Sequence, residues 1–191
     1  MTRIIAGVAG GRRLLTPPGS GTRPTSDRVR EAVFGRLEHL DAIAGGHVVD
    51  LYAGSGALGL EAVSRGATSA LLVESDRKAA ATIDKNVRHL GLAGVHVRAG
   101  TVEAVVSGPL SPRADLVFID PPYAVTDEAL AEVLARLVEH GSLAVDAILV
   151  VERSSRSAEP VWPAGIELIG PRRYGETTCW FADYVPEGET A

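Results

Sequence analysis

The chain has a single cysteine, Cys179, so it cannot form an internal disulfide. This cysteine lies in the apolar stretch 178–181, which predicts a buried, inert thiol rather than a nucleophile. The five histidines show no spacing typical of metal ligands, and we expect no metal site. No apolar run is long enough to span a bilayer, and Arg12 and Arg13 interrupt the N-terminal segment too early for a secretory signal. We therefore expect a cytoplasmic protein.

The composition indicates one globular domain with room for a small appendage. The 191 residues are 46% hydrophobic with a mean hydropathy of +0.13, which excludes a wholly disordered chain. The net charge of −5 is unevenly distributed: residues 1–36 contain seven arginines against Asp27 and Glu31, a local charge of +5, so the remainder carries −10. A basic segment on an acidic body is typical of a phosphate-binding face, although a solvated arginine-rich edge would give the same count.

From residue 47 onward, strand-like and helix-like patterns alternate. Apolar runs predict strands at 47–52, 69–74, 94–98, 115–119, 145–152, 166–171 and 177–184. Periodic segments between them predict helices at 57–66, 76–90, 101–107 and 126–140. This alternation is typical of an α/β fold with a mostly parallel seven-stranded sheet covered on both faces, closed by an antiparallel C-terminal hairpin.

The N-terminal part predicts a small extension over residues 1–40, ahead of a main domain over 41–191. It comprises a short β-hairpin in 1–16, an extended loop in 17–25 and then a helix. Candidate caps for that helix are Thr25, Ser26 and Asp27. Its apolar stripe would pack on the body, and the spacing predicts that its other faces carry Arg28, Arg30 and Glu31.

The most informative motif is Asp120-Pro121-Pro122-Tyr123, directly after the apolar run 116–119. The two prolines make a rigid turn that exposes carbonyl oxygens, because proline fixes φ and has no N–H to donate. Asp120 adds an acceptor and Tyr123 a flat ring, so the motif suits a planar group with an exocyclic NH2. These residues are the catalytic candidates. The alternative, a plain strand terminator, explains the prolines but not the flanking acid and aromatic.

A glycine-rich turn follows the strand predicted at 47–52. Gly54, Gly56 and Gly59 match the G-x-G-x-x-G pattern, which by itself allows either a dinucleotide or another nucleoside cofactor. Asp50 would repel a pyrophosphate at this turn and favours a positively charged ligand such as S-adenosylmethionine. Glu74 ends the next strand and is placed to accept hydrogen bonds from ribose hydroxyls. Because the carboxyl ends of the strands form the ligand-binding edge of such sheets, we expect Asp50, Glu74 and Asp120 to meet there.

These motifs resemble those of class I S-adenosylmethionine-dependent methyltransferases that act on exocyclic amines, with their Rossmann-like fold. The stretches that carry the resemblance are 50–56, Glu74 and 120–123. The stretches 3–7, 11–12 and 22–32 are similar to the narrower RsmD family of bacterial 16S rRNA (guanine-N2)-methyltransferases, which act on the small ribosomal subunit. The similarity runs from residue 3 to about residue 184.

The resemblance implies roles for particular residues. The cofactor-binding set would be Asp50, Tyr52, Ala53, Gly54, Ser55, Gly56, Glu74, Ser75, Gly100, Thr101 and Asp120. Within it, Glu74 would hold the ribose, and backbone atoms near Gly100 and Thr101 would recognise adenine. The RNA-binding set, which comes from the basic segment and the motif, is Arg3, Arg12, Arg13, Arg23, Arg28, Arg30 and Tyr123. Arg172, Arg173 and Tyr174 form a second basic-aromatic candidate, for which an ordinary hairpin tip is an equal alternative.

Several functions remain open at this point. The 120–123 motif would equally serve adenine N6 in nucleic acid or a glutamine amide, and the basic segment favours nucleic acid. A catalytically silent RNA-binding assembly factor is a further alternative, which the intact glycines and acids disfavour. We expect 16S rRNA or the small ribosomal subunit as the partner, no membrane, and a monomer.

Overall fold

A computed structural model describes residues 2–17 and 26–186. Its sheet has the strand order β3-β2-β1-β4-β5-β7-β6. All neighbouring pairs are parallel except those of β7, which runs antiparallel to both β5 and β6. The strands are β1 (His47–Asp50), β2 (Ser69–Glu74), β3 (Val95–Ala99), β4 (Ala114–Ile119), β5 (Leu143–Ser154), β6 (Ile166–Tyr174) and β7 (Thr177–Tyr184). The predicted α/β fold and its C-terminal antiparallel hairpin are confirmed.

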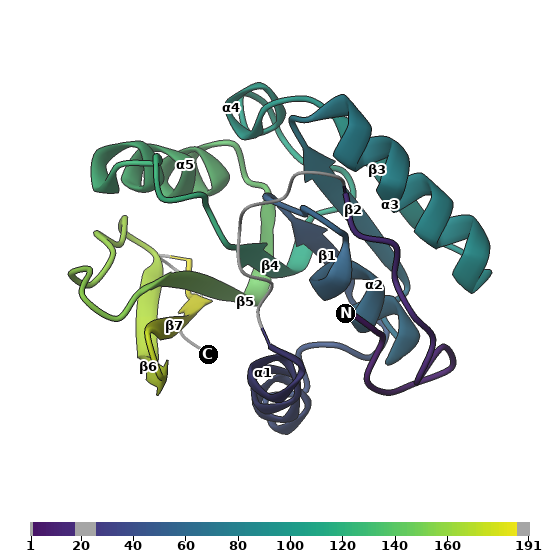
Figure 1. The fold of residues 1–191 in the computed structure, drawn as a ribbon. Helices are drawn as coiled ribbons and strands as arrows, with labels where there is room; N and C mark the ends of the chain where they lie inside the picture. The colour runs from purple at the N-terminus through teal and green to yellow at the C-terminus, as the bar shows by residue number, and fades with distance from the viewer. Residues whose placement is uncertain (1, 18–25, 187–191) are drawn as a thin grey trace.

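Helices cover both faces of the sheet (Figure 1). They are α1 (Asp27–His39), α2 (Ala57–Ser64), α3 (Arg77–Leu90), α4 (Val102–Val105) and α5 (Asp127–Glu139). The apolar side chains of α1, α2 and α3 share one buried cluster with one face of the sheet, and those of α4 and α5 share a second cluster with the other face. None of the described helices is long and apolar enough to cross a membrane.

The predicted N-terminal hairpin is present but short. Arg3 and Arg13 form its single antiparallel bridge, and the N–H of Ile4 donates to the Arg12 carbonyl at 2.9 Å. We call residues 2–15 the N-terminal arm. The arm lies against α2 and α3, so that segments far apart in the sequence are joined.

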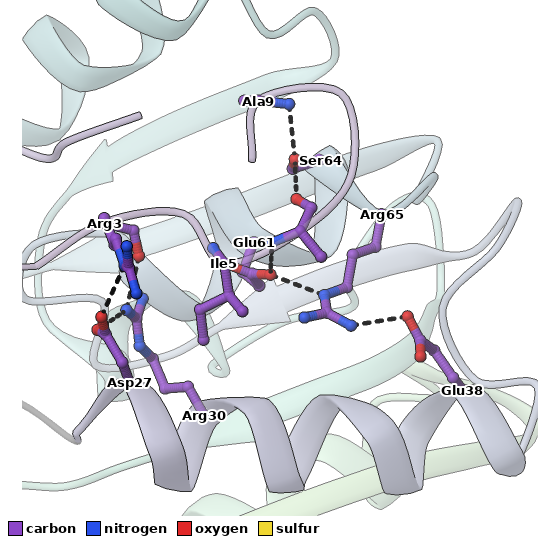
Figure 2. A network of polar contacts seen from close by, with 10 residues as sticks. Arg3, Ile5, Ala9, Asp27, Arg30, Glu38, Glu61, Ser64 and Arg65 are labelled. Atoms are coloured by element: carbon purple, nitrogen blue, oxygen red, sulfur yellow. Dashed lines mark hydrogen bonds and ion pairs between the residues drawn. The ribbon is translucent and has the colours of Figure 1, made fainter. Parts of the chain in front are cut away.

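A buried carboxylate in α2 fixes the arm in place (Figure 2). Glu61 is fully buried and accepts hydrogen bonds from the N–H groups of Ile5 at 2.6 Å and Ala6 at 3.0 Å. Arg65 neutralises it through Nε at 2.7 Å and also reaches Glu38 at 2.7 Å. One turn further along α2, Ser64 accepts from the Ala9 N–H at 2.9 Å. Because a buried charge is costly unless it is paired and hydrogen-bonded, this network makes arm docking specific.

Helix α1 has a predicted cap residue, but Arg30 does not lie on an exposed face as expected. Ser26 caps α1 as predicted, since its side chain accepts from the Val29 N–H at 3.3 Å. Arg30, expected on an exposed face, is instead 1% exposed. Its Nη2 donates to the Arg3 carbonyl at 2.6 Å and to Asp27 at 2.7 Å, so the guanidinium ties the arm to the start of α1. The hydrophobic spacing could not reveal this, because an arginine becomes buried only where such acceptors happen to be within reach.

Candidate active site

Four acidic residues gather at one edge of the sheet. Asp50 and Glu74 end β1 and β2, and Asp120 follows β4. Glu152 lies near the end of β5, and the pairing of Ile119 with Val151 places it beside Asp120. Since all four strands are parallel, their carboxyl ends meet at this edge, as expected for Asp50, Glu74 and Asp120. Glu152 is an addition that the sequence reading missed.

The glycine turn is held open between β1 and α2. Gly54 and Gly56 have φ values of 56° and 81°, in the left-handed region that side chains other than glycine rarely adopt. A Cβ at Gly56 would lie 3.0 Å from the Ile83 side chain, whereas a Cβ at Gly54 would meet nothing within 4 Å. Gly56 caps α2 without a side-chain hydrogen bond. The backbone is therefore closely packed at Gly56, whereas at Gly54 it has space for a ligand.

Glu74 fixes the geometry of this turn. Its Oε2 accepts from the Gly54 N–H at 2.9 Å, and its Oε1 accepts from the Asp76 N–H at 2.8 Å. A carboxylate oxygen can accept two hydrogen bonds, so each oxygen keeps capacity for a ligand hydroxyl. The carbonyl of Glu74 also accepts from the Gly100 N–H at 2.9 Å, which brings Gly100 to the same region.

The Asp50 carboxylate is buried beneath the turn, with 1% exposure. Its Oδ2 accepts from the Gly59 N–H at 3.2 Å, and its Oδ1 has no hydrogen-bond partner. Burial raises the pKa of Asp50 to about 7; the N–H groups of Gly59 and Tyr52 lower it, and the charge of Glu74 raises it further. A cationic ligand beside this buried, unpartnered oxygen would stabilise the ionised form of the carboxylate.

The remaining cofactor candidates surround these acids. Tyr52 is half-buried, Ala53 is buried, and Ser75 is exposed. The Ser55 carbonyl accepts from the Asn86 side chain at 3.1 Å, and that side chain also bonds Leu15 of the arm at 3.0 Å. Thr101 caps α4 by accepting from the Ala104 N–H at 3.3 Å. Asn86 thus links the arm to the glycine turn, and nothing in the sequence pattern signalled this role.

The Asp120-Pro121-Pro122-Tyr123 motif forms a tight turn at the open edge. The Pro122 carbonyl accepts from the Val125 N–H at 2.9 Å, Pro121 is buried, and Tyr123 is 91% exposed. Burial raises the pKa of Asp120 well above its ordinary value, and the negative charges of Glu152 and Asp50 raise it further. The motif therefore presents a partly buried carboxyl group beside a freely accessible aromatic ring.

A small cavity of about 10 Å³ lies behind Asp120, between α1 and the sheet. Arg30, Leu58, Asp120, Glu152 and Cys179 line it. It has room for about one water molecule, so it is too small to hold a ligand of any size. Cys179 is free and buried as expected, and burial raises the pKa of its thiol.

The structure sorts the candidate RNA-binding arginines. Arg13 and Arg28 are exposed, and Arg3 is exposed while pairing with Asp27 at 3.0 Å. Arg12 donates to the Leu90 carbonyl at 2.7 Å and to the His89 carbonyl, so it anchors the arm to the end of α3. Arg30 is buried, and Arg23 lies outside the described residues. Arg3, Arg12, Arg13 and Arg28 are thus exposed, and of these Arg12 is engaged with backbone carbonyls.

The strand order, the reversed β7, the glycine turn after β1 and the acid ending β2 define the class I methyltransferase fold. Solved neighbours of low identity agree: "a putative RNA methyltransferase PH1948 from Pyrococcus horikoshii" has a TM-score of 0.70 at 17% identity, covering 91% of this chain and 94% of that one. The family model described as "Conserved hypothetical protein 95" matches residues 2–183, and the chain belongs to this family.

Individual relatives bear out the resemblance to the RsmD family. "Ribosomal RNA small subunit methyltransferase D" of Escherichia coli is 35% identical over 188 residues, which is 98% of this chain and 92% of the relative. "Putative rRNA methyltransferase YlbH" of Bacillus subtilis is 32% identical, covering 92% of this chain and 95% of the relative. The solved structure titled "Putative methyltransferase yhhF from Escherichia coli" has a TM-score of 0.84 at 30% identity, with 97% of this chain and 99% of that chain covered.

Proposed function

We propose that the protein transfers a methyl group from S-adenosylmethionine to the exocyclic N2 amine of a guanine in the 16S rRNA of the small ribosomal subunit. The observation that carries the proposal is the group of carboxylates at the glycine turn, with the motif 120–123 following β4, the strand that pairs with β1. Carboxylates at this turn disfavour a pyrophosphate and suit a cofactor that brings positive charge. The rRNA methyltransferases among its relatives, similar over nearly the whole chain, support the RNA substrate.

The residues present fit S-adenosylmethionine. The unpartnered Oδ1 of Asp50 would accept from the ammonium group, and Glu74 would accept from the ribose hydroxyls. The open space at Gly54 and Gly100, where a Cβ would meet nothing within 4 Å, leaves the backbone accessible to the cofactor. When bound, S-adenosylmethionine supplies an electrophilic methyl group.

Asp120 and Tyr123 would prepare the acceptor base. A planar amine is a poor nucleophile because its lone pair is delocalised into the ring. Asp120 in its ionised form, together with the Pro121 carbonyl, would accept the amine hydrogens and stabilise the positive charge that develops on nitrogen. Tyr123 would stack on a base that has left its own stack, at a free-energy cost of a few kcal/mol. Holding the base in register would contribute much of the acceleration.

We assign the RNA contact of the extension over residues 1–40 to its accessible arginines. Arg3, Arg13 and Arg28 remain candidates with geometry in their favour, since their side chains are exposed. Arg23 remains a candidate from the sequence. Arg12 and Arg30 are engaged in holding the arm, so we propose a positioning role for them in place of direct phosphate contact.

A transfer assay tests the proposal. The protein is incubated with S-adenosylmethionine labelled on its methyl group and with small ribosomal subunits from bacteria that lack this modification. We expect label in the RNA fraction. Label in a ribosomal protein would instead support the glutamine alternative, and an absence of label would support the silent assembly factor.

A further inference from the structure

The C-terminal hairpin, formed by β6 and β7, returns to the edge of the sheet at which β4 and β5 end (Figure 1). Because β7 pairs antiparallel with β5, Thr177 lies opposite Ser154, so the β6–β7 turn is at the edge where β4 and β5 end. The registers place Cys179 beside Glu152 and Arg172 beside Cys179. Arg172 is therefore level with Asp120 and three strand spacings away, or about 14 Å.

Arg36, which lies beside this hairpin, can be compared with Arg65, because each guanidinium lies over a phenylalanine ring. The guanidinium carbon of Arg65 lies 5.0 Å from the Phe34 ring centroid, and that of Arg36 lies 4.7 Å from the Phe181 centroid. Arg65 has two carboxylate partners, Glu38 and Glu61, which raise its pKa. Arg36 forms no ion pair among the described residues, and its buried Nε has no hydrogen-bond partner.

The charged neighbour of Arg36 is a second cation, Arg172, whereas the charged neighbours of Arg65 are carboxylates. Burial lowers the pKa of Arg36, and the positive charge of Arg172 lowers it further. Arg172 is exposed and likewise has no ion pair in the described part of the chain. Two guanidinium groups held near each other repel one another, and neither forms an ion pair with a described residue, so an anion between them would relieve an existing cost.

Space and a further polar group are available at this position. Gly170 pairs with Phe181, and a Cβ built on Gly170 would meet nothing within 4 Å. Tyr174 is on the same face of β6 as Arg172, and both Arg172 and Arg36 act electrostatically on its hydroxyl. A phenolic hydroxyl can donate a hydrogen bond to an anion. The surface thus offers two cations and a donor beside an open patch of backbone.

The acids of the hairpin do not neutralise Arg36 or Arg172. Glu167 pairs with Asp183 at the opposite end of the hairpin, and Glu176 lies in the turn. None of the three forms an ion pair with Arg36 or Arg172 within residues 2–17 and 26–186. Arg173, which alternates to the other face of β6, donates to the Ser155 carbonyl at 3.3 Å.

We propose that Arg36, Arg172 and Tyr174 form a phosphate-binding site for the RNA backbone, at the C-terminal hairpin, on the sheet edge where Asp120 lies. The inference rests on the proposed RNA methyltransferase function and deepens it. The N-terminal arm lies against α2 and α3, whereas this site lies at β6, at the end of the strand order beyond β4. The RNA strand that presents the target base would be held at both sides, with Tyr123 between them.

Salt-dependent binding tests the site. The affinity for small subunits that lack the modification is measured at several salt concentrations for Arg172→Gln, Tyr174→Phe and the unaltered protein. Arg113→Gln serves as a matched control, because Arg113 is exposed and precedes β4, at the opposite edge of the sheet. We expect Arg172→Gln to weaken binding by about 5–10-fold and to lower the slope of log affinity against log salt by about 0.7–1. S-adenosylmethionine affinity and thermal stability should stay at their original values.

The outcomes are distinguishable. An Arg172→Gln slope equal to that of Arg113→Gln would overturn the phosphate site while leaving the proposed function intact. No salt-dependent binding by the unaltered protein would overturn the proposed function, and this inference with it. Arg36→Lys provides a second check: retained charge should preserve most of the affinity, whereas Arg36→Gln should lose it.

Discussion

The Glu74 carboxylate accepts a hydrogen bond from the Gly54 N–H at 2.9 Å, so the end of β2 sets the shape of the turn after β1. The same residue accepts the Gly100 N–H at its carbonyl, also at 2.9 Å. One acid therefore connects the three segments that follow β1, β2 and β3. A cofactor that spans these segments would find its contacts already ordered, which lowers the entropic cost of binding.

Removing the acceptor at Asp120 should abolish methyl transfer while leaving cofactor binding largely intact. We expect Asp120→Ala to lower the single-turnover rate by about 100-fold or more, since losing one well-placed group that stabilises a charged transition state costs about this much. Isothermal titration with S-adenosylmethionine supplies the control. Near-normal turnover in Asp120→Ala would remove Asp120 from the mechanism.

Asp50 should make cofactor affinity depend on pH. Because the pKa of Asp50 is raised to about 7, the carboxyl becomes protonated as the pH falls from about 8 to about 6. A cationic ligand binds the ionised form better, so we expect S-adenosylmethionine affinity to fall about tenfold over this range. In Asp50→Asn the affinity should be low and independent of pH. A flat profile for the unaltered protein would contradict this role.

The same shift has an opposite effect on the stability of the ligand-free protein. The folded pKa lies above the unfolded value of 3.8, so the folded state binds more protons between these values. Stability should therefore decline as the pH rises from about 4 to about 7. Asp50→Asn should lose this decline and gain roughly 1–4 kcal/mol above neutral pH, measured by chemical denaturation.

Gly100 offers a direct test of where the cofactor lies. A Cβ there meets nothing within 4 Å, and its φ is outside the left-handed region, so Gly100→Ala should fold normally. We expect its S-adenosylmethionine affinity to fall by about 3–10-fold, because the new methyl group would oppose close approach to the backbone. Gly108→Ala is the matched control, with equal free space but a position between α4 and β4. Equal affinities in the two variants would place the adenine elsewhere.

The Glu61 network should control arm docking. Glu61→Gln loses the buried charge opposite Arg65 and one of two acceptors for the arm, so we expect a loss of about 2–4 kcal/mol in unfolding free energy. Glu38→Gln removes the exposed partner of Arg65 and should cost at most about 1 kcal/mol. Trypsin cleavage after Arg12 and Arg13 should speed up only in Glu61→Gln. Equal cleavage rates would show that the arm docks without this carboxylate.

The regular part of the fold was predictable because its signals are local. Each predicted strand from residue 47 onward overlaps an observed one, and Asp50, Glu74 and Asp120 were placed correctly at the carboxyl ends. Glu152 was missed, although it follows the buried run 147–151 just as Asp120 follows 116–119. The same reading of an acid after an apolar run would have found it.

Long-range polar contacts were not predictable. The burial of Arg30 depends on the Arg3 carbonyl, 27 residues away in sequence, and that of Glu61 on backbone N–H groups 55 and 56 residues away. Hydrophobic periodicity carries no information on such pairs. This is why the sequence did not show that Arg12 holds the arm to the end of α3.

The nucleoside that carries the methyl group tests the central proposal most directly. Small subunits that lack the modification are incubated with the protein and labelled S-adenosylmethionine, and their 16S rRNA is digested to nucleosides and separated. We expect the label to co-migrate with N2-methylguanosine and Asp120→Ala to yield none. Label in N6-methyladenosine, or N2-methylguanosine formed equally well by Asp120→Ala, would contradict it.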